Sequence, residues 1–548
     1  MKACGDSSNV RKKSAVIVGL AVIGSRVFGL VREVVFAAMF GAGMLLDSYL
    51  AAFRIPNLLR DLFAEGALST AFVTTFTKVN EKEGSDKGWH LARLVISALI
   101  LVLGIICILG ILASGPLVWM MNYGFAAVPG KLALTTDLTR LLFPFILFVS
   151  LAAVAMGMLN AKNVFGLPAS ASTAFNIVSV FFGVVLAYTF DPQENWMQPH
   201  FSERALYGVC LGVLIGGLAQ LGIQLPKLWQ LGFRYRWELN FNDPALRTVL
   251  LLMIPSVIAG SAVQVNVVVS NFFASHINGA QSWLGSAFRL MQFPIGVFGV
   301  AIATVALPSV SRHHAQDNLP AFGKTVEEAL RLAFYLTLPA SLGLAILAEP
   351  IIRLIYQHGR FDAVATYQTS LALQAYSIGL AGYAGIKVLV PCFYALNLSK
   401  TPVKISLFGM VINIILCFVL VKGFGLGHIG LALTTGLIAL INFLQLLFFM
   451  SRQVNCGRPL HWITFFARVT VACFAMGAVA WIGQFLAEPA SHLGMLPYIA
   501  AIGATIFMAA VTYFGVSFQM GLPESVEMAD FLRRKLNLPV PNRIKPPQ

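Results

Sequence analysis

The sequence predicts an all-α protein that crosses a membrane about fourteen times. Its 548 residues are 58% hydrophobic and 11% charged, and the mean hydropathy is +0.79. Soluble domains carry roughly 25% charged residues. Apolar runs recur from end to end, and each reaches the ~18 residues that an α-helix needs to cross the hydrocarbon core. The runs are continuous rather than alternating, which excludes a transmembrane β-barrel.

Short polar connections separate the expected spans. Hydropathy places these spans at 14–40, 44–77, 91–120, 132–159, 168–190, 205–226, 247–275, 281–311, 325–348, 363–396, 403–421, 427–451, 462–487 and 493–520. The first span follows basic residues, as the apolar part of a signal peptide would. It continues through two arginines without a small-residue cleavage site, so we expect a retained helix.

Basic residues are distributed unevenly between the two sides of the membrane. If the N-terminus is cytoplasmic, roughly 24 Lys and Arg residues lie in cytoplasmic segments and roughly 5 on the opposite side. The positive-inside rule therefore predicts a multi-pass protein with both termini in the cytoplasm. The net charge of +15 reflects this bias, and no nucleic acid partner is expected.

An internal repeat divides the chain into two lobes. Three matched pairs, at separations of 237, 237 and 235 residues, are Asn160 with Asn397, Asn176 with Asn413, and Arg54 with Arg289. A repeat of about six helices gives two parallel, pseudo-symmetric lobes related by an axis along the membrane normal. We expect lobes at 1–230 and 231–455, two additional helices at 456–522, and a polar, proline-rich cytoplasmic tail without fixed structure at 523–548.

Two arginines, Arg26 and Arg32, lie inside the first apolar span. An arginine at the centre of a bilayer costs roughly 2.5–3.5 kcal/mol on insertion scales. Each therefore needs water, a counter-ion or an anionic ligand. These residues are the first indication that the protein handles a charged solute within the membrane.

The second span carries a polar stripe. Its members, which share one helix face at spacings of seven, seven and four residues, are Asp47, Arg54, Asp61 and Glu65. Arg60 lies off this stripe. Such a stripe should face a water-filled cavity or protein. Two interpretations stay open here, a substrate-binding surface and a set of structural salt bridges.

Arg289 lies in the eighth span, with no acidic residue within one helical turn in the sequence. A ligand anion explains an arginine at this depth better than packing does. Arg26, Arg32, Arg54 and Arg289 could line one cationic cavity, and the planar guanidinium fork suits phosphate groups. Prolines follow shortly after two of these arginines. Pro56 and Pro294 are expected to bend or hinge their helices.

The remaining sequence motifs indicate helix packing, and motifs of metal sites and enzymes do not occur. Gly212 and Gly216 form a GxxxG pair that should permit close helix packing. The seven cysteines are scattered without a CxxC pair, so neither a metal site nor a disulfide framework is expected. No Walker, HExxH or nucleophile-elbow motif occurs, and we expect a transporter without a cofactor rather than an enzyme.

Four segments together resemble one known family. They are Ser25-Arg26-Val27-Phe28-Gly29-Leu30-Val31-Arg32-Glu33, residues 53–67 (Phe-Arg-Ile-Pro-Asn-Leu-Leu-Arg-Asp-Leu-Phe-Ala-Glu-Gly-Ala), residues 288–297 (Phe-Arg-Leu-Met-Gln-Phe-Pro-Ile-Gly-Val), and the connection from Pro391 to Lys404. These segments resemble the MurJ (MviN) lipid II flippases of the MOP exporter superfamily. The resemblance extends from about residue 14 to about residue 404.

The resemblance implies fourteen helices, with two lobes around a cationic cavity and a lipid groove formed by the last two helices. It implies lipid II, the undecaprenyl-pyrophosphate-linked peptidoglycan precursor, as substrate in the bacterial cytoplasmic membrane. The family positions expected to bind or support this substrate correspond to Arg26, Arg32, Asp47, Arg54, Arg60, Glu65 and Arg289. This chain departs from the family at Phe288 and Gln292, where relatives often carry acids. Either the charge of Arg289 is then freer for the substrate, or another acid such as Asp47 balances it.

The expected mechanism is alternating access, with arginines capturing the pyrophosphate. An ion gradient, with the ion left open, or the membrane potential could supply the energy. Membrane lipids and the cell-wall synthesis machinery are the other expected partners. Two competing functions are a multidrug exporter of the same superfamily, which would favour an acidic cavity, and a scaffold of the cell-wall machinery, which would not need a charged interior.

Overall fold

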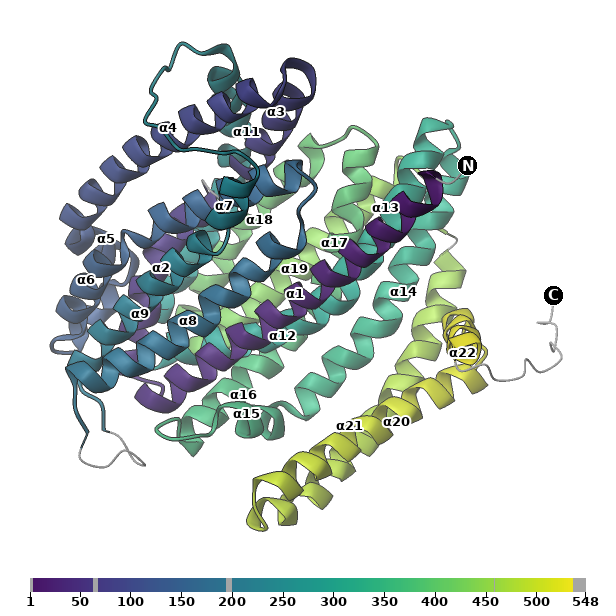
Figure 1. Ribbon diagram of the computed structural model, residues 1–548. Coiled ribbons are helices and arrows are strands. Elements are labelled where there is room, and N and C mark those ends of the chain that lie inside the picture. The colour runs from purple at the N-terminus through teal and green to yellow at the C-terminus, as the bar shows by residue number, and fades with distance from the viewer. Residues whose placement is uncertain (1–2, 63–67, 194–199, 458, 536–548) are drawn as a thin grey trace. The chain divides into compact units, whose positions relative to one another are not determined.

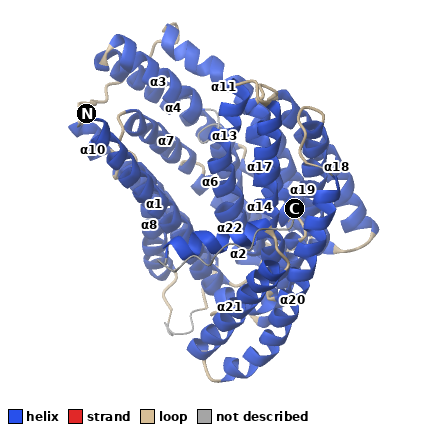
Figure 2. Cartoon of the chain, turned by 90° about the vertical axis from the view of Figure 1, so that its right-hand side faces the viewer, coloured by secondary structure: helices blue, strands red, loops and turns tan. Residues whose placement is uncertain are grey.

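The computed structural model describes residues 3–62, 68–193, 200–457 and 459–535. Helices and their connections make up these ranges, and no strand occurs in them (Figure 2). Contacts divide the chain into two compact units. The first unit comprises Met1–Trp283 with Tyr356–Ala365, and the second comprises Leu284–Ile355 with Thr366–Gln548. The lobe boundaries expected from the repeat stay a prediction.

The first unit contains the helices of the N-terminal half of the chain. In order they are α1 (Ala3–Phe40), α2 (Met44–Arg60), α3 (Ser69–Glu83), α4 (Ser85–Leu112), α5 (Ser114–Met121), the 3₁₀ helix η2 (Tyr123–Ala127), α6 (Lys131–Leu142), α7 (Phe145–Ala161), α8 (Gly166–Phe190), α9 (Glu203–Gly222), α10 (Leu225–Gln230) and α11 (Pro244–Ala274). The long α1 lies against α8 (Figure 1).

The remaining helices belong mostly to the second unit. They are α12 (Ala280–Pro294), the π-helix η3 (Ile295–Gly299), α13 (Val300–Ala315), α14 (Leu319–Ile346), α15 (Ala348–Tyr356), α16 (Ala363–Ser377), α17 (Leu380–Ala395), α18 (Lys400–Cys417), the π-helix η4 (Phe418–Gly423), α19 (Gly427–Ser451), α20 (Pro459–His492), α21 (Met495–Gln519) and α22 (Pro523–Lys535). The first turn of α12 lies in the first unit.

The helices confirm the all-α membrane class. Within the described residues, ten helices are long and apolar enough to cross a membrane, or up to eleven if the bent pair α16 and α17 counts as one span. The number fourteen stays a prediction. Several predicted spans contain a break that hydropathy does not register, such as the 45° bend between α16 and α17.

Glycines bring α8 and α9 into close contact. A Cβ atom on Gly212 would lie 2.3 Å from the backbone nitrogen of Gly183, and one on Gly216 would lie 2.0 Å from the Ser179 hydroxyl. A side chain at either position would push the helices apart. The predicted role of the GxxxG pair in close packing is confirmed.

Each unit has its own hydrophobic core. In the second unit, the Tyr513 hydroxyl donates to the Tyr335 carbonyl at 2.6 Å, and the Tyr335 hydroxyl lies 2.7 Å from the Ser517 hydroxyl. All three side chains are buried. These hydrogen bonds satisfy polar atoms that lipid could not satisfy, and they tie α14 to α21.

The expectation of an unstructured tail from residue 523 is wrong for residues 523–535, which form α22. The Arg331 side chain on α14 donates to Glu524 at 2.7 Å, and both side chains are largely buried. The Arg331 guanidinium also lies 5.1 Å from the centre of the Phe465 ring. Composition alone missed this helix because a specific ion pair, rather than apolar content, attaches it.

Candidate functional site

The two arginines of α1 have different surroundings. Arg26 is exposed, whereas Arg32 is only 8% exposed. The Arg32 guanidinium lies 5.0 Å from the Phe175 ring centre and 5.8 Å from the Phe53 ring centre. Aromatic ring faces stabilise a cation in a place where water is scarce. Packing thus accounts for part of the cost of burying Arg32.

The predicted site residues of α2 and its end differ in exposure and in their contacts. Arg54 is exposed. Arg60 donates to Asp61 at 2.8 Å, so these sequence neighbours form an ion pair. Pro56 is buried inside α2. The remaining member of the predicted stripe, Glu65, lies outside the described residues.

Arg289 is an exposed residue of α12 in the second unit. Its neighbour Phe288 packs edge-on against Tyr376, with ring centres 5.4 Å apart, and Gln292 is exposed. Pro294 ends α12, and the π-helix η3 follows it directly. The predicted common cavity of the arginines and the predicted hinges stay predictions.

Asp47 is a buried and extensively hydrogen-bonded residue of the predicted site. Its side chain is completely buried, and both carboxylate oxygens accept hydrogen bonds. One oxygen accepts from Lys131 Nζ at 2.8 Å and from the Gly279 backbone N–H at 2.7 Å. The other accepts from the Ser282 N–H at 3.0 Å and from its hydroxyl at 2.6 Å. Asp47 therefore caps the N-terminus of α12, which favours a negative charge.

Lys131 is the cation of this arrangement. It begins α6, an end of the helix that disfavours positive charge, and its side chain is 1% exposed. Three groups compensate for this: Asp47, the Asn278 side-chain oxygen at 2.9 Å, and the Phe125 ring, whose centre lies 4.2 Å away. Lys131 is thus held from several sides.

We call Asp47, Lys131, Asn278, Gly279 and Ser282 the Asp47 hub. It joins the first turns of α2, α6 and α12, all within the first unit.

The loops beside the hub interlock. A Cβ atom on Gly124 would lie 2.5 Å from the backbone nitrogen of His276, so only glycine allows this approach. The Gly124 N–H donates to the Ser275 hydroxyl at 3.0 Å. Gln281 donates to the Asn122 side-chain oxygen at 2.6 Å. The connection before α6 and the connection before α12 therefore form one packed layer.

Sequence reasoning grouped Asp47 with Arg54 on the stripe, and the predicted spans 91–120 and 132–159 leave Lys131 in the connection between them. The structure instead pairs Asp47 with Lys131. One signal could have drawn attention to Lys131, namely its place among the few basic residues assigned to the non-cytoplasmic side. The partner could not be inferred, because 84 residues separate Lys131 from Asp47.

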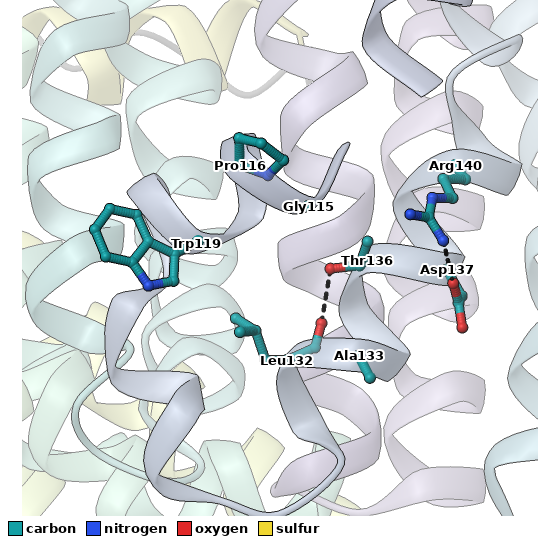
Figure 3. A pocket seen from close by; sticks show the side chains of 8 residues that line it. All are labelled: Gly115, Pro116, Trp119, Leu132, Ala133, Thr136, Asp137 and Arg140. Carbon is teal, nitrogen blue, oxygen red and sulfur yellow. Dashed lines mark hydrogen bonds and ion pairs between the residues drawn. The ribbon is translucent and has the colours of Figure 1, made fainter. Parts of the chain in front are cut away.

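A cavity of about 540 Å³ lies between α5 and α6 (Figure 3). Trp119 and Leu132 line it, together with the ion pair of Arg140 with Asp137, in which nitrogen and oxygen are 2.9 Å apart. These two charges balance each other within one helical turn. No residue of the predicted site lines this cavity, so we do not assign the substrate to it.

The titratable side chains can be compared with the geometry of a metal site. Within the described part of the chain, no group of three His, Cys, Asp or Glu side chains is placed to hold a metal ion. In the first unit, the charged groups of interest are the arginines of α1 and α2 and the Asp47 hub, and in the second unit Arg289.

Comparison with known proteins identifies the family. A sequence model described as lipid II flippase MurJ matches residues 36–502. The lipid II flippase MurJ of Burkholderia cenocepacia is 33% identical over 504 residues, covering 91% of this chain and 95% of the relative. The chain belongs to the MurJ lipid II flippase family.

Solved structures agree with the MurJ assignment. A lipid II flippase MurJ in an inward closed conformation has a TM-score of 0.75 and 25% identity, covering 95% of this chain and all of that one. An inward-facing multidrug resistance MATE transporter of the MOP superfamily has a TM-score of 0.62 at 14% identity, covering 80% of this chain and 98% of that one, and it shares the fold.

Membership of the MurJ family makes the chain a multi-pass membrane transporter rather than an enzyme. The expected family is confirmed. The matched residues begin at 36, so Arg26 and Arg32 precede the family match, whereas Asp47, Arg54 and Arg289 lie within it.

Proposed function

We propose that this protein flips lipid II from the inner to the outer leaflet of the bacterial cytoplasmic membrane by alternating access, with both termini in the cytoplasm. The observation that carries the proposal is the family match over residues 36–502. The uneven distribution of basic residues in the sequence supports the orientation.

The arginines provide the chemistry that this substrate requires. A pyrophosphate within the membrane needs counter-charges and several hydrogen-bond donors, and guanidinium groups supply both. Exposed Arg26, Arg54 and Arg289 are the proposed ligands of the pyrophosphate. Arg32, whose guanidinium lies near two phenylalanine rings, is proposed to add positive electrostatic potential for the pyrophosphate. Arg60 and Glu65 are proposed to contribute further charges at the end of the second span.

The Asp47 hub is proposed to act as the outer latch. The basic-residue bias assigns the first turns of α2, α6 and α12 to the outer side of the membrane. While Asp47 accepts hydrogen bonds from Lys131, Gly279 and Ser282, the outer ends of α2 and α12 cannot separate. Release of the head group then requires these bonds to break, and substrate binding must favour the open state by its differential affinity.

No cofactor is proposed. An ion gradient or the membrane potential is the proposed energy source, because moving one elementary charge across 100 mV is worth about 2.3 kcal/mol. The excess of arginines in the cavity-forming helices gives the potential charges on which to act.

The decisive experiment measures flipping of fluorescent lipid II in vesicles that contain the purified protein. We expect Arg289→Ala to reduce the rate at least tenfold, since it removes a proposed ligand of the pyrophosphate. Lys324→Ala is the control, because Lys324 is an exposed cation in a long surface pair with Glu328, with nitrogen and oxygen 4.0 Å apart. Undiminished flipping by Arg289→Ala would remove Arg289 from the mechanism.

Two further assays distinguish the competing functions. The intact chain should sustain growth of a strain depleted of its lipid II flippase, and Arg26→Ala should not. A scaffold would tolerate Arg26→Ala. A multidrug exporter would instead lower the accumulation of a cationic dye, and we expect no such efflux.

A further inference from the structure

The connection between α10 and α11 is a candidate lipid-binding element that transport does not explain. We call residues 231–243 the strap. Gly232 follows the end of α10 and has a backbone φ of +94°, a conformation that favours glycine. The chain then runs without helical turns to residue 240. In Figure 1 the strap is the irregular teal segment that leads into α11 beside α4.

Specific contacts hold the strap along α4. Glu238 accepts from the Arg93 side chain at 2.7 Å, and His90 Nδ1 lies 2.7 Å from its other oxygen. The Glu238 backbone N–H donates to the Ser97 hydroxyl at 3.2 Å. At the start of the strap, Phe233 is buried and packs against the Trp89 ring, with centres 5.5 Å apart. The strap is therefore ordered against α4.

With its anchors turned inward, the strap exposes large apolar side chains. Trp237 is 55% exposed, Phe241 47% and Tyr235 42%. Exposed arginines, Arg234 and Arg236, alternate with the aromatics. One guanidinium nitrogen of Arg234 donates to the Trp229 and Phe233 carbonyls at 2.8 and 3.0 Å, which holds the exposed side chain at the start of the strap. Within the described residues, no hydrogen bond or ion pair involves the Arg236 side chain.

The only acids of the strap, Glu238 and Asp243, are turned toward α4. Glu238 pairs with Arg93 and His90, and the Asp243 carboxylate lies 3.9 Å from the His90 ring. The outward surface is thus aromatic and cationic.

This combination matches the headgroup layer of a membrane. Amphipathic aromatic rings concentrate at the membrane–water boundary, and each basic residue near an anionic surface contributes about 1 kcal/mol of binding. The strap also lies where a boundary is expected, since it connects the end of the apolar helical segment Glu203–Gln230 to α11 and runs beside the start of the apolar helix α4. A soluble protein partner would not require this position at the helix ends.

We propose that the strap is a binding site for anionic phospholipid, with Arg234 and Arg236 on the headgroup phosphates and Trp237 inserted at the acyl boundary. Glu238 is a positioning residue, because it holds the strap in the shape that presents these side chains.

The test uses the purified full-length protein in mixed micelles, with tryptophan fluorescence quenched by lipids that carry brominated acyl chains. The difference between the native chain and Trp237→Phe isolates the signal of Trp237. We expect phosphatidylglycerol to reach half-quenching at a several-fold lower mole fraction than phosphatidylcholine. Arg234→Gln and Arg236→Gln should each reduce this preference about fivefold, the factor that ~1 kcal/mol per basic residue gives.

The Glu238→Gln variant distinguishes lipid binding at an ordered site from nonspecific electrostatic attraction. It removes one negative charge, so attraction alone predicts a stronger preference for phosphatidylglycerol, whereas loss of the anchor predicts a weaker one. Glu83→Gln is the control, because it removes the same charge from an exposed pair with Lys87. Size-exclusion profiles establish that each variant is folded.

Equal quenching by both lipids, or no quenching of Trp237 by either, would overturn the proposal. A stronger preference in Glu238→Gln would overturn the role of Glu238. The assay contains no lipid II, so its outcome is independent of the transport proposal.

Discussion

Asp47 illustrates how a buried charge can be tolerated at the end of a membrane helix. Four donors satisfy its two oxygens, and the N-terminus of α12 adds favourable potential. Desolvation of Asp47 and Lys131 offsets much of their attraction, so the pair is a weak source of net stability. Removing only one partner is nevertheless destabilising, because the other charge then stays buried without a counter-charge.

Asp47→Asn should therefore destabilise the protein by about 3–5 kcal/mol, the usual cost of an uncompensated buried charge. Lys131→Met alone should be destabilising as well. The double variant should recover at least 1 kcal/mol relative to the sum of the two single changes. Thermal melting of the purified protein, followed by tryptophan fluorescence, measures all three.

This double-mutant cycle has a matched control in the exposed ion pair of Arg140 with Asp137. The corresponding changes there should shift stability by less than about 1 kcal/mol, as is usual for surface pairs. Strictly additive effects at Asp47 and Lys131 would contradict the ion pair as the origin of the cost.

Elements were easier to predict than residue partners, for a physical reason. Hydropathy is a local property, so most helix bounds follow the expected spans, as α19 does for residues 427–451. Breaks such as the π-helix after Pro294 depend on how each helix packs. Asp47 and Ser282 are 235 residues apart, and no local pattern reveals such a contact.

The C-terminal helix α22 provides a test at the scale of an element. Glu524→Gln weakens the hydrogen bond from Arg331, and bonds to charged groups contribute about 1.5–3 kcal/mol. Amide hydrogen exchange in residues 523–535 should accelerate about tenfold, while α14 and α21 should be unaffected. Glu527→Gln is the control on the same helix, because Glu527 is exposed. Equal exchange in both variants would show that the ion pair does not hold α22.

At the scale of the whole molecule, the Asp47 hub can be compared with the predicted internal repeat. The separation of Asp47 from Ser282, 235 residues, equals that of Arg54 from Arg289 in the sequence. In the predicted repeat, Asp47 and Ser282 would be equivalent positions, and the structure places their side chains in hydrogen-bond contact. A few hydrogen bonds between the first turns of α2 and α12 would then be enough for the proposed latch.

The latch can be tested by the access of water-soluble reagents from outside the cell. Gln281 is buried beside the hub, so in a cysteine-free background Gln281→Cys should react slowly with a membrane-impermeant maleimide. Adding Lys131→Ala should raise the labelling rate at least tenfold, because the proposed closed state loses the cation that binds Asp47.

Tyr123→Cys, at a position 48% exposed on the same layer, is the control and should react rapidly in both backgrounds. If Gln281→Cys labels at the same rate with and without Lys131, the hub does not control access from the outer side. If Tyr123→Cys labels only in permeabilised cells, the proposed orientation in the membrane is reversed.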